Sequence, residues 1–225
     1  MTPWYDTIPT LVQILTAVSG LAVAAWALLG SNWQALREHS TAQHLFAGSV
    51  LVMATMWAGS AGVRPGLDFY LLGYTAAVLM MGLRLALVAG LLALLLNSIM
   101  VAWLQGDAAW PMLGYRYLVQ IALPMLFSYG FYRWVYLRMA HNPFIYMLVA
   151  GFFNAGFTHA VADLLNGGAL WALGVYSAEQ IWHDYLRYFP LTMFPEGIVN
   201  GMFIAGMVAF HPLWLSTFDE ESYFR

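Results

Sequence analysis

The sequence predicts an all-α membrane protein, a polytopic bundle of about seven transmembrane helices in a single domain, 1–225. Of its 225 residues, 62% are hydrophobic and 8% are charged, whereas soluble domains have roughly 45–50% apolar and about 25% charged residues. Such a chain cannot present a normally solvated surface. Its apolar residues also gather in runs near the length of about 20 residues that crosses a bilayer as a helix. These two observations predict an integral membrane protein.

Seven segments are long and apolar enough to be expected as spans: 8–30, 44–63, 69–83, 84–104, 117–138, 143–166 and 190–215. The third and fourth form one apolar stretch that is too long for a single ordinary span, so we expect a turn at Leu83-Arg84, next to Gly82. Residues 167–189 open with Gly167-Gly168 and carry several charges. We expect them to form an interfacial helix or a re-entrant excursion.

The arginines predict the orientation, because short cytoplasmic loops carry the positive excess. An N-out and C-in topology puts five arginines in the cytoplasm and three outside. The five are Arg37, Arg84, Arg133, Arg138 and Arg225, and the three are Arg64, Arg116 and Arg187. Glycines gather in the second, third, sixth and last spans. Since small residues allow close helix packing in lipid, these spans should form the inner bundle.

Composition excludes several function classes. The chain has 8 arginines, no lysine, 11 acidic residues and a formal charge of −3, so it lacks the basic surface that nucleic acid requires. It has no cysteine, which excludes disulfides, thiolate ligands and iron–sulfur clusters. The sequence contains no phosphate-binding nucleotide loop and no motif of metalloproteases or serine hydrolases. We expect no enzyme activity, and any energy for transport must come from another subunit.

Glu196 is the most informative single residue, because it lies in a stretch otherwise apolar enough to span a bilayer. A charge at the centre of such a helix costs about 2.5–3.5 kcal/mol, so these residues usually face the bundle interior and mark a substrate or ion path. Pro195 suits a first helical turn, which would place Glu196 near the positive end of the last helix. Asn200 follows four residues later on the same face. An interfacial glutamate is the alternative.

The sixth span also carries polar residues, Asn154, His159 and Asp163. His159 and Asp163 are four residues apart and share a helix face. A histidine oriented by a carboxylate is typical of a metal ligand or a proton relay, although a histidine satisfied by a neighbouring helix is the alternative. If both polar faces point inward, the substrate or ion path comprises Glu196, Asn200, His159, Asp163 and Asn154. The candidate metal ligands are His159, Asp163 and Glu196.

Asn97 in the fourth span and Gln120 in the fifth are expected to make structural hydrogen bonds between helices. The alternative is that both residues join the polar network of the expected path.

Three stretches together resemble the CbiM-like family, the membrane permease of energy-coupling-factor ABC transporters for cobalt and nickel. They are Gly66-Leu67-Asp68-Phe69-Tyr70 through Met81-Gly82, Asn142-Pro143-Phe144 with Gly151-Phe152-Phe153, and Phe194-Pro195-Glu196-Gly197 with Asn200-Gly201-Met202. The resemblance implies a substrate-capturing subunit in the lipid bilayer of the bacterial inner (plasma) membrane. Its implied partners are a transmembrane coupling subunit and cytoplasmic ATPase subunits, or another membrane complex. No cofactor is implied, but a transition-metal ion is the implied cargo.

Two positions depart from the family pattern. Members that bind cobalt or nickel have a histidine as the second residue, where this chain has Thr2 followed by Pro3, and Tyr70 stands where the central motif has a histidine. Three interpretations follow. The first is a permease or substrate-capture subunit for a divalent transition-metal cation. The second is an accessory membrane subunit that keeps the fold without the metal site. The weakest is a redox subunit that uses His159 and His183 as ligands.

Overall fold

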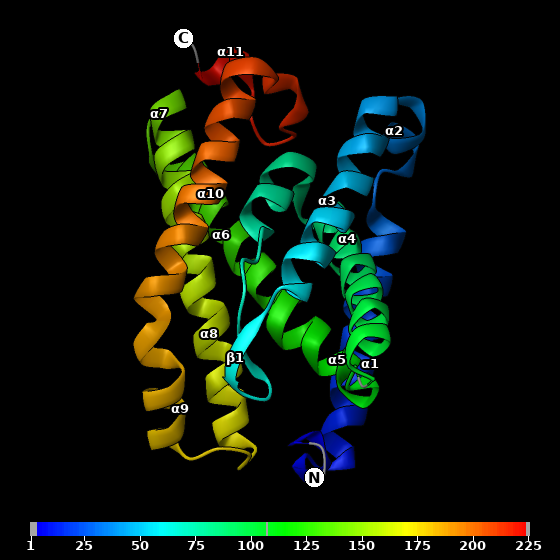
Figure 1. Ribbon diagram of the computed structural model, residues 1–225. Helices are drawn as coiled ribbons and strands as arrows, with labels where there is room; N and C mark the ends of the chain where they lie inside the picture. Colours follow the sequence, from blue (N-terminus) through cyan, green and yellow to red (C-terminus); the bar gives the residue numbers. More distant parts are fainter. Residues whose placement is uncertain (1–3, 107, 224–225) are drawn as a thin grey trace.

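Long helices packed side by side account for most of the chain (Figure 1). The computed structural model describes residues 4–106 and 108–223. The helices of the first half are η1 (Trp4–Thr7), α1 (Thr10–Gly30), α2 (Trp33–Glu38), α3 (Ser40–Ala58) and α4 (Tyr74–Gln105). Those of the second half are η2 (Trp110–Met112), α5 (Leu113–Tyr115), π-helical η3 (Arg116–Ala122), α6 (Leu123–Arg138), α7 (Pro143–Ile145), π-helical η4 (Tyr146–Phe153), α8 (Asn154–Ala172), α9 (Ala178–Asp184), η5 (Leu186–Tyr188), α10 (Phe189–Phe210), η6 (Pro212–Trp214) and α11 (Glu220–Tyr223). The helical membrane class is confirmed.

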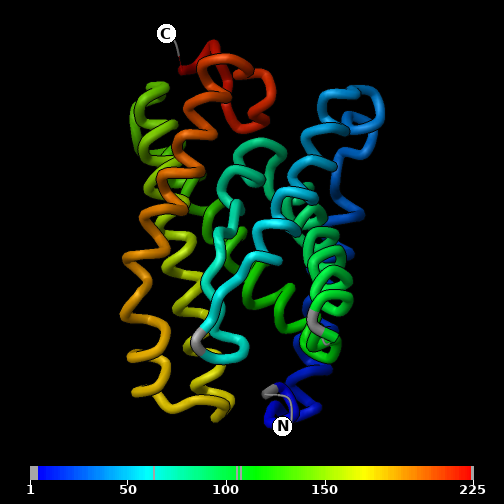
Figure 2. Tube along the Cα trace, viewed as in Figure 1, coloured from blue at the N-terminus to red at the C-terminus, as the bar shows by residue number. Residues whose placement is uncertain are grey.

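Within the described residues, four helical stretches are long and apolar enough to cross a membrane. They are Thr10–Gly30, Tyr74–Leu104, Pro143–Ala172 and Ala178–Phe210. The predicted count of seven spans is therefore not confirmed. The tube in Figure 2 places η1 and α11 at opposite ends of the bundle. The N-out and C-in orientation stays a prediction.

A glycine interrupts α4 where the sequence predicts a turn. Gly82 has φ +75° and ψ 167°, and it separates a short helix, 74–81, from a long one, 83–105. The predicted third span, 69–83, is therefore wrong as a full crossing. A helix of this length extends only roughly 12 Å, whereas the hydrocarbon core is roughly 30 Å thick. The short helix ends beside the C-terminal segment, where the backbone N–H of Ser216 donates to the carbonyl of Met80 (2.9 Å).

A small antiparallel hairpin, β1 (Ala61–Arg64) and β2 (Leu67–Phe69), adds strands to the predicted all-α fold. Pro65 and Gly66 form its turn, and Gly66 has φ +82°. Proline followed by a glycine with positive φ suits a type II turn. The sequence prediction of a helix through residue 63 is wrong here, because α3 ends at Ala58 and the chain turns back as strands.

The hairpin is held against α8, α9 and the turn between them. The side-chain N–H of Asn166 donates to the carbonyl of Gly66 (2.9 Å), and the Tyr176 hydroxyl donates to the carbonyl of Pro65 (2.8 Å). Arg64 forms an ion pair with Asp184 of α9. These contacts place the hairpin at the end of the bundle that carries η1 and α9 (Figure 1).

The predicted interfacial segment, 167–189, begins later than expected. Gly167 and Gly168 do not end the sixth span, because α8 continues to Ala172. A Cβ atom on Gly167 would lie 3.0 Å from a methyl of Ile181, so the missing side chain lets α9 pack closely on α8. The short helix α9 lies within the predicted segment, and Ser177 and Gln180 form a capping box at its start.

Buried apolar residues form clusters between the helices. One joins α1, α3, α4 and η3, a second joins the start of α4, α6, η4, α10 and the C-terminal segment, and a third lies around the hairpin, α5, α8 and α9. Many large apolar side chains remain exposed on the outside, including Leu11, Leu29 and Leu213. An apolar outer surface around a packed interior suits a protein surrounded by lipid.

Glycines bring α10 against η4, which are parts of two of the glycine-rich spans predicted for the inner bundle. A Cβ atom on Gly201 would lie 2.9 Å from the Cβ of Phe152, and one on Gly197 would lie 3.0 Å from the Phe152 carbonyl oxygen. The same helix contains Gly206, which has no neighbouring atom within 4 Å of such a Cβ. Packing therefore depends on two of the glycines in this helix and not on the third.

Replacing Gly201 with alanine should destabilise the bundle. The added methyl group must push Phe152 away, and such overpacking costs about 1–3 kcal/mol. Gly206→Ala is the matched control, since it adds the same methyl group in open space and should be neutral or stabilising by up to about 1 kcal/mol. Thermal unfolding in detergent measures both. Equal melting temperatures for the two variants would contradict the packing described here.

Candidate functional site

The carboxylate of Glu196 binds the backbone at the start of another helix, α4. Its Oε2 accepts from the N–H of Leu72 (2.7 Å) and its Oε1 from the N–H of Gly73 (2.8 Å). Gly73 takes φ +72° and Tyr74 begins the helix. The first N–H groups of a helix have no partner within it and carry a partial positive charge, so a carboxylate is favoured there. Glu196 is 1% exposed, and these bonds offset its removal from water.

Asn200 completes this cap. Its Oδ1 accepts from the N–H of Ala76 (3.0 Å), and its Nδ2 donates to Glu196 Oε1 (2.8 Å). Glu196 and Asn200 therefore lie on one buried face of α10, as their spacing of four residues predicts. The prediction that Pro195 starts the last helix is wrong, because α10 begins at Phe189 and Pro195 lies inside it. Glu196 therefore lies at the positive end of α4 and not at that of its own helix.

His159 lies between two carboxylates. Its Nε2 is 3.6 Å from Asp163 Oδ2, and its Nδ1 is 3.6 Å from Glu196 Oε2. Both distances exceed a normal hydrogen bond, and buried Nδ1 has no hydrogen-bond partner among the described residues. The ring is 2% exposed. The structure thus brings His159, Asp163 and Glu196 together in the order acid, imidazole, acid.

This order determines whether the three predicted metal ligands can bind one metal ion together. The two ring nitrogens point in different directions, so one ion cannot be bound by both nitrogens of the imidazole. In the part of the chain that the structure describes, no group of three or more His, Asp or Glu side chains is arranged to hold a metal ion. Thr2, the other position of interest for metal binding, lies outside the described residues.

Asp163 is held by hydroxyl groups from the segment after α8. Tyr185 donates to Oδ1 (2.7 Å), and Thr192 donates to Oδ2 at a longer distance of 3.4 Å. Asp163 is 5% exposed. Its face of α8 continues to Asn166, whose Oδ1 accepts from both Tyr115 and Gln120 (3.0 Å each). The polar face of α8 therefore extends from His159 to Asn166.

Asn154 lies apart from this group. Its Nδ2 donates to the carbonyl of Ser128 in α6 (3.0 Å), and its Oδ1 accepts from Thr158 (3.2 Å). The Ser128 hydroxyl in turn bonds that of Thr75 in α4 (3.0 Å). Asn154 thus joins α8 to α6, and the structure does not place it with the other predicted path residues.

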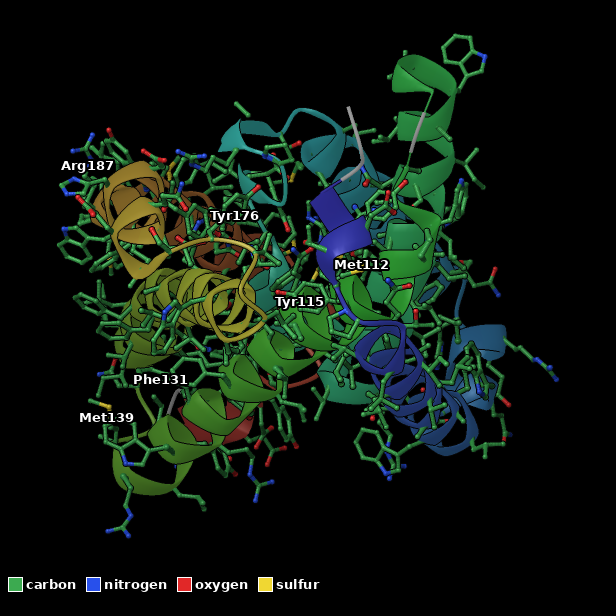
Figure 3. The ribbon with its side chains drawn as sticks, turned by 90° about the horizontal axis from the view of Figure 1, so that it is seen from below. Met112, Tyr115, Phe131, Met139, Tyr176 and Arg187 are labelled. Carbon is green, nitrogen blue, oxygen red and sulfur yellow. The ribbon has the colours of Figure 1, made fainter. Side chains whose placement is uncertain are left out.

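A polar cavity of about 310 Å³ lies beside His159 and Asp163. Elements distant in the sequence line it: the hairpin and the residues after it, α3, α4, η3, α8 and Tyr185. Its polar lining residues are Tyr5, Ser60, Asp68, Tyr70, Asn97, Arg116, Gln120, His159, Asp163, Asn166 and Tyr185. Seen from the hairpin end in Figure 3, Tyr115 lies toward the middle of the bundle and Arg187 at its edge.

The predicted path residues divide between the cavity and its support. His159 and Asp163 line the cavity, whereas Glu196, Asn200 and Asn154 are not among its lining residues. Tyr70, which stands where the family motif has a histidine, is a lining residue and contacts the ring of Trp57 (centroids 6.4 Å apart). Asn97 and Gln120 make the expected interhelical hydrogen bonds, to Ala54 and Asn166, and also line the cavity.

Sequence reasoning missed Asp68, Arg116 and Asn166 as cavity residues. Asn166 could have been found, because His159, Asp163 and Asn166 follow the i, i+4, i+7 spacing of one helix face. Arg116 was assigned to a loop outside the membrane, but it begins η3 and lines the cavity. Burial raises the pKa of the Asp68 carboxyl, and the charge of Arg116 opposes this effect.

Comparisons with known proteins identify the family and the fold. A family model described as the cobalt uptake substrate-specific transmembrane region, CbiM, matches residues 7–214. The fold resembles a solved structure titled as a truncated transition metal transporter, with a TM-score of 0.61 and 16% identity over 91% of this chain and 94% of that one. A second, titled as a transition metal transporter, has the same score and identity and is covered over 89% of its length. The search of curated protein sequences finds no match.

Removing the Glu196 carboxylate should loosen the start of α4. Glu196→Ala leaves the N–H groups of Leu72 and Gly73 without their acceptor, and two lost bonds to a charged group should cost about 3 kcal/mol or more. Glu196→Gln keeps one acceptor oxygen and should cost less. Hydrogen exchange of residues 72–76 and thermal unfolding in detergent measure the effect.

The control is Glu179→Ala, which removes an exposed carboxylate from α9. It should leave exchange and melting temperature unchanged. If the amides of Leu72 and Gly73 stay equally protected in Glu196→Ala, the capping role is wrong.

Proposed function

Because the chain belongs to the CbiM family, described as the cobalt uptake substrate-specific transmembrane region, we propose that it captures a divalent transition-metal cation for an energy-coupling-factor-type transporter. The chain is an integral membrane transport protein and not an enzyme. Its proposed partners are a transmembrane coupling subunit and cytoplasmic ATPase subunits, in the bacterial inner membrane. The missing nucleotide-binding motif supports this division of labour, since the energy must be supplied by another chain.

The polar cavity is the observation that carries this proposal. It places the His159 imidazole and the carboxylates of Asp163 and Asp68 around one space inside a largely apolar bundle. Imidazole nitrogen and carboxylate oxygen are both ligands for divalent first-row metals. Ionisable residues inside a membrane protein usually mark a substrate path. In this proposal His159 and Asp163 contact the metal, while Glu196 and Asn200 hold the cavity wall that α4 provides.

A specific observation also favours the accessory-subunit interpretation as a second candidate. Tyr70 replaces a motif histidine, and the described residues contain no group of three ligands arranged for a metal ion. A chain with this function would keep the family fold and stabilise a larger membrane complex without capturing metal. The two candidates differ in what a change inside the cavity does to metal uptake.

Metal accumulation in the cells that make this protein separates the candidates. Deleting the gene for this protein should lower the cellular content of cobalt or nickel, measured by mass spectrometry. Producing the wild-type protein in the deletion strain should restore that content. Asp163→Asn and His159→Ala should restore less than about a tenth of the difference, because each removes a proposed ligand. Glu179→Gln, an exposed carboxylate on α9, should restore it fully.

Normal cobalt or nickel uptake with both the His159→Ala and the Asp163→Asn variants would contradict the proposed metal-capture role. If the deletion instead leaves metal levels unchanged but reduces the amounts of co-purifying membrane chains, the accessory function is supported. Purification in mild detergent and identification of those chains also tests the proposed coupling and ATPase partners.

A further inference from the structure

An arginine side chain lines the cavity that is proposed to receive a cation. Two of the Arg116 N–H groups are used inside the protein: Nη1 donates to the Ser98 hydroxyl (3.2 Å) and Nη2 donates to Asn97 Oδ1 (3.0 Å). Both acceptors are neutral. A guanidinium has five N–H donors, and the remaining ones have no hydrogen-bond acceptor among the described side chains and backbone.

The charge of Arg116 also lacks a direct partner. Within residues 4–106 and 108–223, no carboxylate oxygen lies within 4.0 Å of its nitrogens, whereas Arg64 has such a partner in Asp184. Asn97, which holds the guanidinium, is itself fixed by a bond from its Nδ2 to the carbonyl of Ala54 (3.2 Å). The positive group is therefore held in place at the cavity wall and retains free donors.

The size of the cavity indicates a guest larger than a bare ion. One water molecule needs about 10–15 Å³ of comparable space, so a cavity of about 310 Å³ has room for a small organic molecule. A bare divalent ion would fill little of it. The Asp68 and Asp163 carboxylates attract a cation, but the Arg116 guanidinium repels one and attracts an anionic group. The cavity lining also includes the His159 imidazole and the Asp163 carboxylate, which are ligand types for a divalent metal.

We propose that this cavity binds a small carboxylate-bearing solute, with the carboxylate on Arg116, either alone or as the chelate of a divalent metal. The planar fork of a guanidinium matches a carboxylate and can bind it through two N–H groups. In the chelate, the metal lies toward His159 and Asp163 while the free carboxylate lies on Arg116. The chelate form rests on the proposed metal uptake and names the form in which the metal is captured.

Binding to the full-length protein in mild detergent tests the inference by equilibrium dialysis with radioactive nickel and labelled citrate. The probes are nickel alone, citrate alone, the one-to-one nickel–citrate complex, and a nickel–ethylenediamine complex that lacks carboxylates. Citrate or nickel–citrate should bind at least about tenfold more tightly than the two probes without carboxylate. The ratio of the two labels distinguishes free carboxylate from chelate.

Substitutions then test the role of Arg116. Arg116→Gln should weaken binding of the carboxylate probe at least about tenfold, and Arg116→Lys, which keeps the charge without the fork, should fall between it and wild type. Arg133→Gln is the matched control, because this exposed arginine of α6 is not a lining residue. Size-exclusion chromatography checks that each variant is folded. If Arg116→Gln does not fold, the comparison of Arg116→Lys with wild type tests the inference.

Three results would overturn the inference: nickel alone or nickel–ethylenediamine binds as tightly as nickel–citrate, neither carboxylate probe binds, or binding of that probe is unchanged without the arginine. In the first case the proposed metal uptake still stands. Binding of citrate without nickel, dependent on Arg116, would support the inference and count against a metal cargo. The two proposals therefore fail separately.

Discussion

The arrangement of the bundle depends on a carboxylate that one helix provides to the start of another. Glu196 accepts from Leu72 and Gly73, and Asn200 accepts from Ala76, so α10 holds the chain where it changes from extended backbone to the helix α4. In an apolar interior these N–H groups have no water to bind, and each one left unpaired would cost about 1–3 kcal/mol. The same hydrogen bonds offset the burial of the glutamate. The short helix at the start of α4 can begin inside the bundle because its first N–H groups are capped in this way.

The cavity depends on where the helix α4 begins. Since the helical part of this region begins only at Tyr74, the residues before it run as hairpin and extended chain and bring Asp68 and Tyr70 to the cavity. The long part of α4 then contributes Asn97 and holds Arg116 through it. Another part of the cavity wall comes from α8. There His159 lies 3.6 Å from the capping carboxylate of Glu196, and Asp163 accepts a hydrogen bond from Tyr185. Leu72 belongs both to the cap and to the cavity lining, and His159 of the lining lies beside Glu196 of the cap, so we expect a change at one to affect the other.

Sequence reasoning identified the membrane class, the turn beside Gly82 and the shared face of Glu196 and Asn200, because each follows from local composition or helical spacing. The family was identified separately, from the resemblance of three motif stretches. It could not assign the partner of Glu196. A carboxylate at helical spacing is compatible with an ion path and with a cap, and only the approach of Leu72 and Gly73, more than 120 positions away in the chain, decides between them. Arg116 was missed for a similar reason, since an arginine at the end of an apolar run matches a loop until η3 and α4 are placed together. The hairpin was missed because residues 61–63 continue the apolar run of the second predicted span and the second strand has only three residues.

The hairpin is attached at its turn mainly through backbone atoms. Asn166 and Tyr176 donate to the carbonyl oxygens of Gly66 and Pro65, which any residue at those positions would also present. Mutational scanning of side chains at the turn would therefore register Gly66 for its positive φ but would overlook these two attachments. They are encoded a hundred or more positions away, in the amide of Asn166 and the hydroxyl of Tyr176. Covariation between the turn and these residues should be weak, although they hold the hairpin that closes the cavity wall.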